Sequence, residues 1–453
     1  MPSSGKFLFT PPLPPRSVSK AASTTNDKND IGTNHLLLSG DDVQLTNKQI
    51  RGMAIDISVY CQAADDSHNN TALRYGRYEC SINLNKALQT DGFALVRGFG
   101  VSARLCNDAL RAARSFLHEA DESVRRSCLT KDRARRGYSP MCTENFASLI
   151  GEQGPNDLVK KFRVGPKSNN TNDEHHLHPI SSLHQPNEWP TEADWDQNNA
   201  HFFKSTIEKY FETICKVADC ILRAICDGIL AENENACIAE SIRILSESSN
   251  NTNNDAGHDN ETKNHTSILT LLGYQPGSRH KKGHRAYMRP LISAHTDVGV
   301  ITVLHFDGGQ CAALERAAKS RTCDNTISSE NIEWIDVNLP TLDDDDNDPV
   351  FVVNVGDCLS ELSGGTLRST LHRVMPRPSC TQPIEHDKAH HAIASTTRTC
   401  LALFVGLEPS ATLKFPGSEE VLSYEEWRRQ RILRATAVRK YKTTQSSNIP
   451  SGI

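Results

Sequence analysis

The sequence predicts a mainly β core with flanking helices, in which the strands form a sandwich or barrel. From about residue 267 the chain consists of short runs of β-branched and apolar residues separated by polar turn signals. Before that point, apolar residues recur at three- and four-residue steps, which is typical of helices. We therefore expect a helix-rich α/β region followed by a β core.

Each expected element has its own signal in the sequence. The long segment 194–230 carries one apolar stripe and is predicted to be a helix that supports a sheet. The other expected helices are 84–88, 102–118 and 419–441. Strands are expected at 53–58, 92–97, 268–274, 292–304, 334–337, 350–355, 372–374 and 398–405.

These elements divide the chain into five parts. Residues 1–50 are rich in Ser, Thr, Pro and Asn and are expected to be a disordered tail. An α/β region with the long supporting helix follows at 51–245, and a low-complexity loop at 246–266. The β core is expected at 267–411, and a C-terminal helix and tail at 412–453.

Composition limits the classes of partner. The net charge of −5 gives no basic field for nucleic acid or an anionic membrane, and no apolar run approaches the roughly 20 residues of a membrane span. The 14 cysteines are scattered without C-x-x-C pairs, which favours reduced thiols in the cytoplasm. The first 25 residues contain basic but no acidic residues, so an organellar transit peptide is the alternative location.

The tripeptide His295-Thr296-Asp297 is the strongest candidate for chemistry. On an extended strand alternate side chains share a face, so His295 and Asp297 are expected to point the same way. A second histidine, His372, lies in a later expected strand. Two imidazoles and one carboxylate would hold a metal and leave coordination positions open, as non-haem Fe(II) oxygenases require.

Arg398 begins the expected strand after His372, and Cys400 lies on the same face. Apolar residues and threonine occupy the other face, so both faces are expected to be buried. A buried guanidinium needs an anion, and its planar fork suits a carboxylate. The anion could be a ligand, or an acidic side chain of the protein.

Several motifs in this order resemble the Fe(II)/2-oxoglutarate-dependent dioxygenases, in particular the isopenicillin-N-synthase-like branch. The resemblance covers about residues 53–440 except for the polar inserts. The motifs are residues 293–304, 334–337, 353–357, 362–374 and 398–404 in the β half, with 91–93, 136–138, 161–163 and 187–190 before them.

The resemblance implies a double-stranded β-helix, also called a jelly roll, and an oxidoreductase. It implies that His295, Asp297 and His372 bind Fe(II), and that no catalytic residue is needed beyond this metal centre. Arg398 would bind the distal carboxylate of 2-oxoglutarate, with help from Cys400 and Tyr274. With O2, such an enzyme oxidises a small organic molecule and releases succinate and CO2. Hydroxylation is the default outcome, with desaturation or ring closure as alternatives.

Two departures from the family pattern leave alternatives open. Cys400 stands where the family usually has serine, and Arg398 follows His372 at a longer interval than usual because of the polar stretch 379–397. An oxidase of the same fold that does not use 2-oxoglutarate is therefore one alternative. A non-catalytic ligand-binding protein on this fold is the other. Asp357 is expected to shape a turn and Asn354 also suits a turn, and neither is expected to be catalytic.

Overall fold

The structure is a computed structural model that describes residues 46–61, 71–131, 135–166, 185–232, 235–250, 265–275, 289–307, 311–318, 332–340, 348–377 and 397–447. The predicted tail at 1–50 and loop at 246–266 lie mostly outside these residues. Helix α1 (Asn47–Met53) begins before the predicted boundary at residue 50, and α7 (Ala236–Asn250) extends past the one at 245. The five-part division of the chain stays a prediction.

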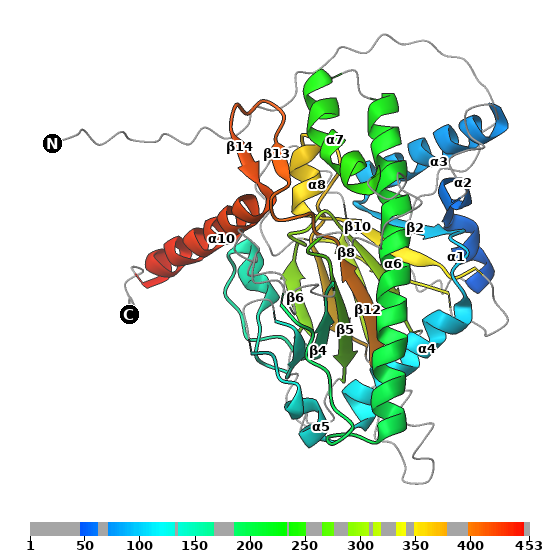
Figure 1. Ribbon diagram of the computed structural model, residues 1–453. Helices are drawn as coiled ribbons and strands as arrows, with labels where there is room; N and C mark the ends of the chain where they lie inside the picture. The colour runs from blue at the N-terminus through cyan, green and yellow to red at the C-terminus, as the bar shows by residue number, and fades with distance from the viewer. Residues whose placement is uncertain are drawn as a thin grey trace, which may run out of the picture. The chain divides into compact units, whose positions relative to one another are not determined.

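Two large sheets form the β core (Figure 1). The eight-stranded sheet has the order β1 (Ile55–Asp56), β2 (Phe93–Arg97), β10 (Phe351–Val355), β7 (Ile301–Phe306), β12 (Arg398–Phe404), β5 (Ile268–Tyr274), β4 (Val159–Val164) and β3 (Gly137–Ser139). The four-stranded sheet has the order β6 (Ile292–His295), β11 (His372–Pro376), β8 (Ala312–Ala317) and β9 (Trp334–Val337). A small sheet pairs β13 (Thr412–Lys414) with β14 (Val421–Ser423).

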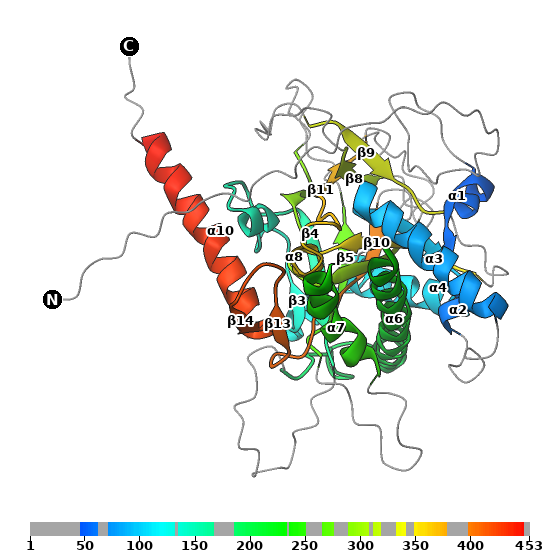
Figure 2. The same ribbon diagram turned by 90° about the horizontal axis from the view of Figure 1, so that it is seen from above.

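Helices pack against the eight-stranded sheet. The long helix α6 (Gln197–Glu232) runs beside α3 (Thr71–Thr90) and α4 (Ala103–Arg114), as both views show (Figures 1 and 2). The remaining helices are α2 (Ser58–Cys61), the π-helix η2 (Ser115–Glu119), α5 (Glu122–Ser127), the 3-10 helix η3 (Phe146–Ile150), α8 (Asp357–Leu362) and α10 (Tyr424–Ser447). The predicted role of α6 as a support for the sheet is confirmed.

Strand β12 contributes side chains to two hydrophobic cores, one on each face. Leu401 and Leu403 point into the large core shared with the helices. Cys400 and Ala402 point into a second core that contains residues of both sheets. The expectation that this strand is buried on both faces is therefore confirmed. The two sheets pack face to face, and the alternate side chains of β12 fill the space between them.

The predicted strand at 292–304 is wrong in one respect, because the chain breaks between β6 and β7. These two strands belong to different sheets, so residues 296–300 cross from one sheet to the other. Gly356 packs against this crossing, and a Cβ there would lie 2.1 Å from the carbonyl oxygen of Gly299. The predicted strand at 53–58 is also too long, since only Ile55–Asp56 pairs and helices lie on either side. Strands β3, β4 and β8 were not predicted.

Candidate active site

Three side chains from two separate parts of the chain converge at one end of the four-stranded sheet. His295 ends β6, His372 begins β11, and the two residues are partners across these strands. Asp297 lies two residues beyond β6, outside the strand. Its Oδ1 atom is 3.6 Å from Nε2 of His295 and 3.8 Å from Nε2 of His372. We call these three residues the triad.

The triad has the geometry of a site for one metal ion. One ligand atom from each residue lies within 4.8 Å of the others, and all three side chains are buried. The predicted grouping of the three residues is therefore found. His295 and Asp297 face the same site, as predicted, although Asp297 lies beyond the end of β6, where the chain turns it toward the histidines.

Backbone carbonyl groups orient both imidazole rings. Nδ1 of His295 lies 2.8 Å from the carbonyl oxygen of Ser293, and Nδ1 of His372 lies 3.0 Å from that of Thr370. A carbonyl only accepts hydrogen bonds, so each Nδ1 carries the proton that it donates. In the neutral ring, Nε2 then has the free lone pair that a metal ligand requires, and in both histidines this atom faces the centre of the triad.

Two neutral donors orient the carboxylate of Asp297. Oδ2 accepts hydrogen bonds from the Thr302 hydroxyl at 2.6 Å and from the Asn354 amide at 2.8 Å. Thr302 and Asn354 are partners across β7 and β10, which brings both donors to the same oxygen. Oδ1 stays directed at the two imidazoles. Such partners fix a ligand's orientation and raise metal affinity.

Burial and charge set the protonation states that metal binding needs. Burial, together with the neighbouring His372, lowers the pKa of His295 to about 3, so its ring is neutral at pH 7. Burial alone would raise the pKa of Asp297. The two imidazoles and the hydrogen bonds from Thr302 and Asn354 outweigh burial and hold this pKa below its usual value. A neutral imidazole and an ionised carboxylate are the ligating forms.

Arg398 lies in the cavity that the triad borders. Its guanidinium packs over the ring of Phe306, with the central carbon 4.2 Å from the ring centroid. The side chain is buried, and its Nη1 atom has no hydrogen-bond partner among the described residues. No ion pair to Arg398 is found in the described part of the chain either, so its charge is open to an anion in the cavity.

Tyr274 and Cys400 line the same cavity. Tyr274 is the partner of Arg398 across β5 and β12, and its ring centroid lies 5.7 Å from the guanidinium carbon. Cys400 is on the same face of β12, as expected. Burial raises the pKa of the Cys400 thiol to about 12, so the thiol is neutral. The structure thus places all six predicted site residues around one cavity.

Two residues that suit turns in the sequence have further roles in the structure. Asn354 lies inside β10 and donates to Asp297, as described above. Asp357 accepts hydrogen bonds from Ser369 at 2.6 Å and from Thr296 at 3.3 Å, and it forms an ion pair with Arg431 of α10 at 2.7 Å. It thereby joins the segments that carry Asp297 and His372. The sequence did not indicate these roles because the partners come from distant parts of the chain.

A jelly-roll core with two histidines and one aspartate at a cavity defines the class of non-haem metal-dependent oxygenases. Within this class, the chain is similar to 2-oxoglutarate-dependent dioxygenases. Residues 55–192 match the family described as non-haem dioxygenase in morphine synthesis N-terminal. The chain is 25% identical to the 2-oxoglutarate-dependent dioxygenase caaD of Aspergillus niger, over 66% of this chain and 74% of that protein. It is 24% identical to a homoarginine-6-hydroxylase of Arabidopsis thaliana, over 71% and 72%.

Solved structures share the fold. A Neurospora crassa protein in complex with alpha-KG and thymine matches with a TM-score of 0.54 at 19% identity, over 84% of this chain and 96% of that one. A 2OG-Fe(II) oxygenase family protein from Caulobacter crescentus matches with a TM-score of 0.53 at 17% identity, over 84% and 98%. The chain belongs to the Fe(II)/2-oxoglutarate-dependent dioxygenase family, in its isopenicillin-N-synthase-like branch. The predicted family and fold are confirmed.

The helices of the described residues are too short or too polar to cross a bilayer.

Proposed function

We propose that this protein is an Fe(II)- and 2-oxoglutarate-dependent dioxygenase that hydroxylates a small organic molecule and releases succinate and CO2. His295, Asp297 and His372 bind the Fe(II). Arg398 binds the distal carboxylate of 2-oxoglutarate, and Tyr274 and Cys400 line the space around it. The names of the relatives, which include 2-oxoglutarate-dependent dioxygenases and hydroxylases, support this proposal.

The proposal rests above all on the position of Arg398. A buried guanidinium without an anionic partner in the described residues is costly, and here it shares a cavity with the triad. The triad would hold the metal and Arg398 would hold a carboxylate of the co-substrate, so that both charges would be balanced. The residues present therefore fit both the metal and the co-substrate. Cys400, in the position where the family usually has serine, is a poorer hydrogen-bond donor, so Arg398 carries most of this binding.

The chain's own residues bind the metal and the co-substrate, orient the metal ligands and shield the metal centre from water. Fe(II) with 2-oxoglutarate supplies the oxidising chemistry, in which O2 is consumed and one of its oxygen atoms goes to the substrate. Thr302 and Asn354 hold Asp297 in place, while the carbonyl groups of Ser293 and Thr370 fix the two imidazoles. Phe146 packs 4.7 Å from the His295 ring, and apolar residues line most of the cavity, so water is excluded from the metal centre.

Anaerobic titration with Fe(II) and 2-oxoglutarate tests this proposal. A visible charge-transfer band is expected in the wild-type protein, followed by release of succinate when O2 is admitted. Arg398→Ala is expected to weaken 2-oxoglutarate binding without loss of Fe(II). If the apparent affinity for 2-oxoglutarate does not change in Arg398→Ala, the alternative oxidase, which does not use this co-substrate, is favoured instead.

We further propose a cytoplasmic location and no nucleic-acid or membrane partner. No disulfide joins cysteines in the described part of the chain, which supports a reducing compartment.

A further inference from the structure

A second cavity adjoins the one that holds the triad and Arg398. Phe146, Asp297 and Phe404 line both cavities, so a molecule in the second cavity lies next to the metal centre. The second cavity is bounded by η3, β5 and α10. We call it the α10 cavity.

Most of the wall of the α10 cavity is apolar, which suits a hydrocarbon body. The apolar lining residues include Phe146, Leu149, Ile268, Val298, Phe404 and Ile432. Two arginines, Arg163 and Arg428, also line it. The two guanidinium groups differ in whether the protein already supplies their anion.

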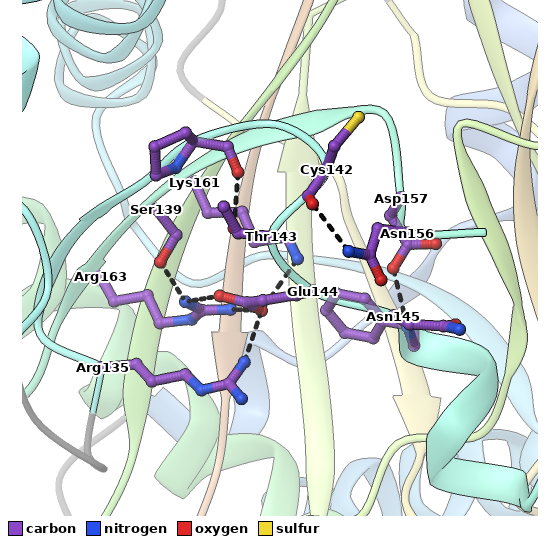
Figure 3. A network of polar contacts seen from close by, with 12 residues as sticks. Arg135, Ser139, Cys142, Thr143, Glu144, Asn145, Asn156, Asp157, Lys161 and Arg163 are labelled. Atoms are coloured by element: carbon purple, nitrogen blue, oxygen red, sulfur yellow. Dashed lines mark hydrogen bonds and ion pairs between the residues drawn. The ribbon is translucent and has the colours of Figure 1, made fainter. Parts of the chain in front are cut away.

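The charge of Arg163 is already committed to Glu144 (Figure 3). The two side chains form a bidentate pair with N–O distances of 2.9 Å and 2.7 Å. Lys161 and Arg135 bind the same carboxylate at 2.9 Å and 3.0 Å. Arg163 therefore contributes positive potential to the cavity, while its planar fork is occupied by the protein.

Arg428 differs from Arg429, Arg431 and Arg434 of the same helix. On α10, Arg429 pairs with Glu426, Arg431 with Asp357, and Arg434 with Glu361. Arg428 is half-buried, lines the cavity, and has no ion-pair partner among the described residues. A guanidinium that is partly removed from water beside an apolar cavity gains most from an anion that enters the cavity.

Thr270 provides an independent sign of a polar ligand group. Its side chain is 1% exposed and lines the same cavity. Its hydroxyl oxygen has no hydrogen-bond partner within the described residues. Buried hydroxyl groups are normally hydrogen-bonded, so this one is available to a ligand atom.

We propose that the α10 cavity binds the primary substrate, and that this substrate is an organic acid with an apolar body. Arg428 binds the carboxylate, Thr270 donates a hydrogen bond, and Phe146 and Phe404 contact the hydrocarbon part next to the triad. This inference rests on the proposed function, and it names the substrate class for the same active site. Arg428 is then a specificity-determining residue with no role in binding Fe(II) or 2-oxoglutarate.

The test uses the full-length protein, saturated anaerobically with Fe(II) and 2-oxoglutarate. Calorimetry measures its affinity for a panel of straight-chain and arylalkyl carboxylates and for the primary amide of each. The wild type is expected to bind at least one acid about tenfold more tightly than its amide. Arg428→Gln is expected to bind acid and amide equally, and Thr270→Val to lose a few-fold in affinity for the acid. Both variants should form the visible band at the wild-type concentration of 2-oxoglutarate.

Arg429→Gln is the matched control, because Arg429 is exposed and pairs with Glu426 on the same helix. It should retain the preference for acids. If no acid of the panel is preferred to its amide, or if the preference survives in Arg428→Gln, the inference is overturned. If the visible band itself does not form in the wild type, the proposed function fails, so the two failures are distinguishable.

Discussion

Two carboxylates near the active site, buried Asp297 and partly buried Glu144, are balanced in opposite ways. Glu144 is surrounded by Lys161, Arg163 and Arg135, so the protein supplies more positive charge than the carboxylate needs. Asp297 accepts hydrogen bonds only from neutral donors on one oxygen and faces the two histidine rings with the other. The first arrangement is a complete structural ion cluster. The second has no lysine or arginine partner among the described residues, and a bound metal ion would supply that positive charge.

The largest difference between the two carboxylates is expected in activity. Asp297→Ala removes a metal ligand, so Fe(II) binding and succinate release should fall to the assay background. Glu144→Gln removes a charge that contacts no ligand, and this variant should still bind Fe(II). Metal content and succinate release, measured on both purified variants, check this prediction. Wild-type activity in Asp297→Ala would contradict the assignment of the triad.

For the free energy of unfolding we expect the reverse, with the larger effect at Glu144. Glu144→Ala leaves Lys161 and Arg163 buried without their carboxylate, and such a change costs about 3–5 kcal/mol of the free energy of unfolding. Arg135 is 53% exposed, so Arg135→Ala should cost less than about 1 kcal/mol. Urea unfolding of the two variants measures both values. Equal losses of unfolding free energy in the two variants would show that burial does not determine how much these ion pairs stabilise the fold.

Within the metal centre, the two residues that donate hydrogen bonds to Asp297 are expected to affect the affinity for Fe(II). Asn354→Ala or Thr302→Val removes one of the two hydrogen bonds to Oδ2 of Asp297, and each should lower Fe(II) affinity by about 10- to 100-fold. Thr213→Val, on the exposed face of α6, serves as the control. Competition with a chelator measures the affinities. Unchanged affinity in both donor variants would mean that β6 and β11 alone fix the ligand geometry.

The smallest expected effect is a dependence of stability on pH. Burial alone would raise the pKa of Glu144, but the ion pairs with Arg163, Lys161 and Arg135 outweigh burial and hold this pKa well below its usual 4.5. Glu144 therefore stabilises the fold fully above pH 4.5, and this contribution is lost as the pH falls below that value. The difference in unfolding free energy between the wild type and Glu144→Gln should be smaller at pH 3.5 than at pH 7. A constant difference would contradict the lowered pKa.

The sequence predicted the features that depend on residues close together in the chain. The order of motifs around His295, Asp297 and His372 was enough to predict the family and the jelly roll, and the placement of Arg398 and Cys400 on one face of a strand was found as expected. The stripe of apolar residues on α6 also predicted its packing. These features depend on neighbours in sequence, or on periods of two and 3.6 residues.

Features that depend on pairing between distant segments were missed. Asn354 resembles a turn residue within Asn354-Val355-Gly356-Asp357, and only its register opposite Thr302 shows that it serves Asp297. The break after His295 was missed although Asp297 and Gly299, which favour turns, interrupt the apolar residues between 292 and 304. Arg428 is one of several arginines in a polar helix, and its location at a cavity depends on how α10 packs against η3.

Anaerobic titration of the metal-free protein with Fe(II) tests the central claim most directly. In the presence of saturating 2-oxoglutarate, the visible band should reach its plateau at one Fe(II) per chain in the wild type and in Glu144→Gln. It should be absent in Asp297→Ala. A plateau at one Fe(II) per chain in all three proteins would show that the iron binds elsewhere and would contradict the account.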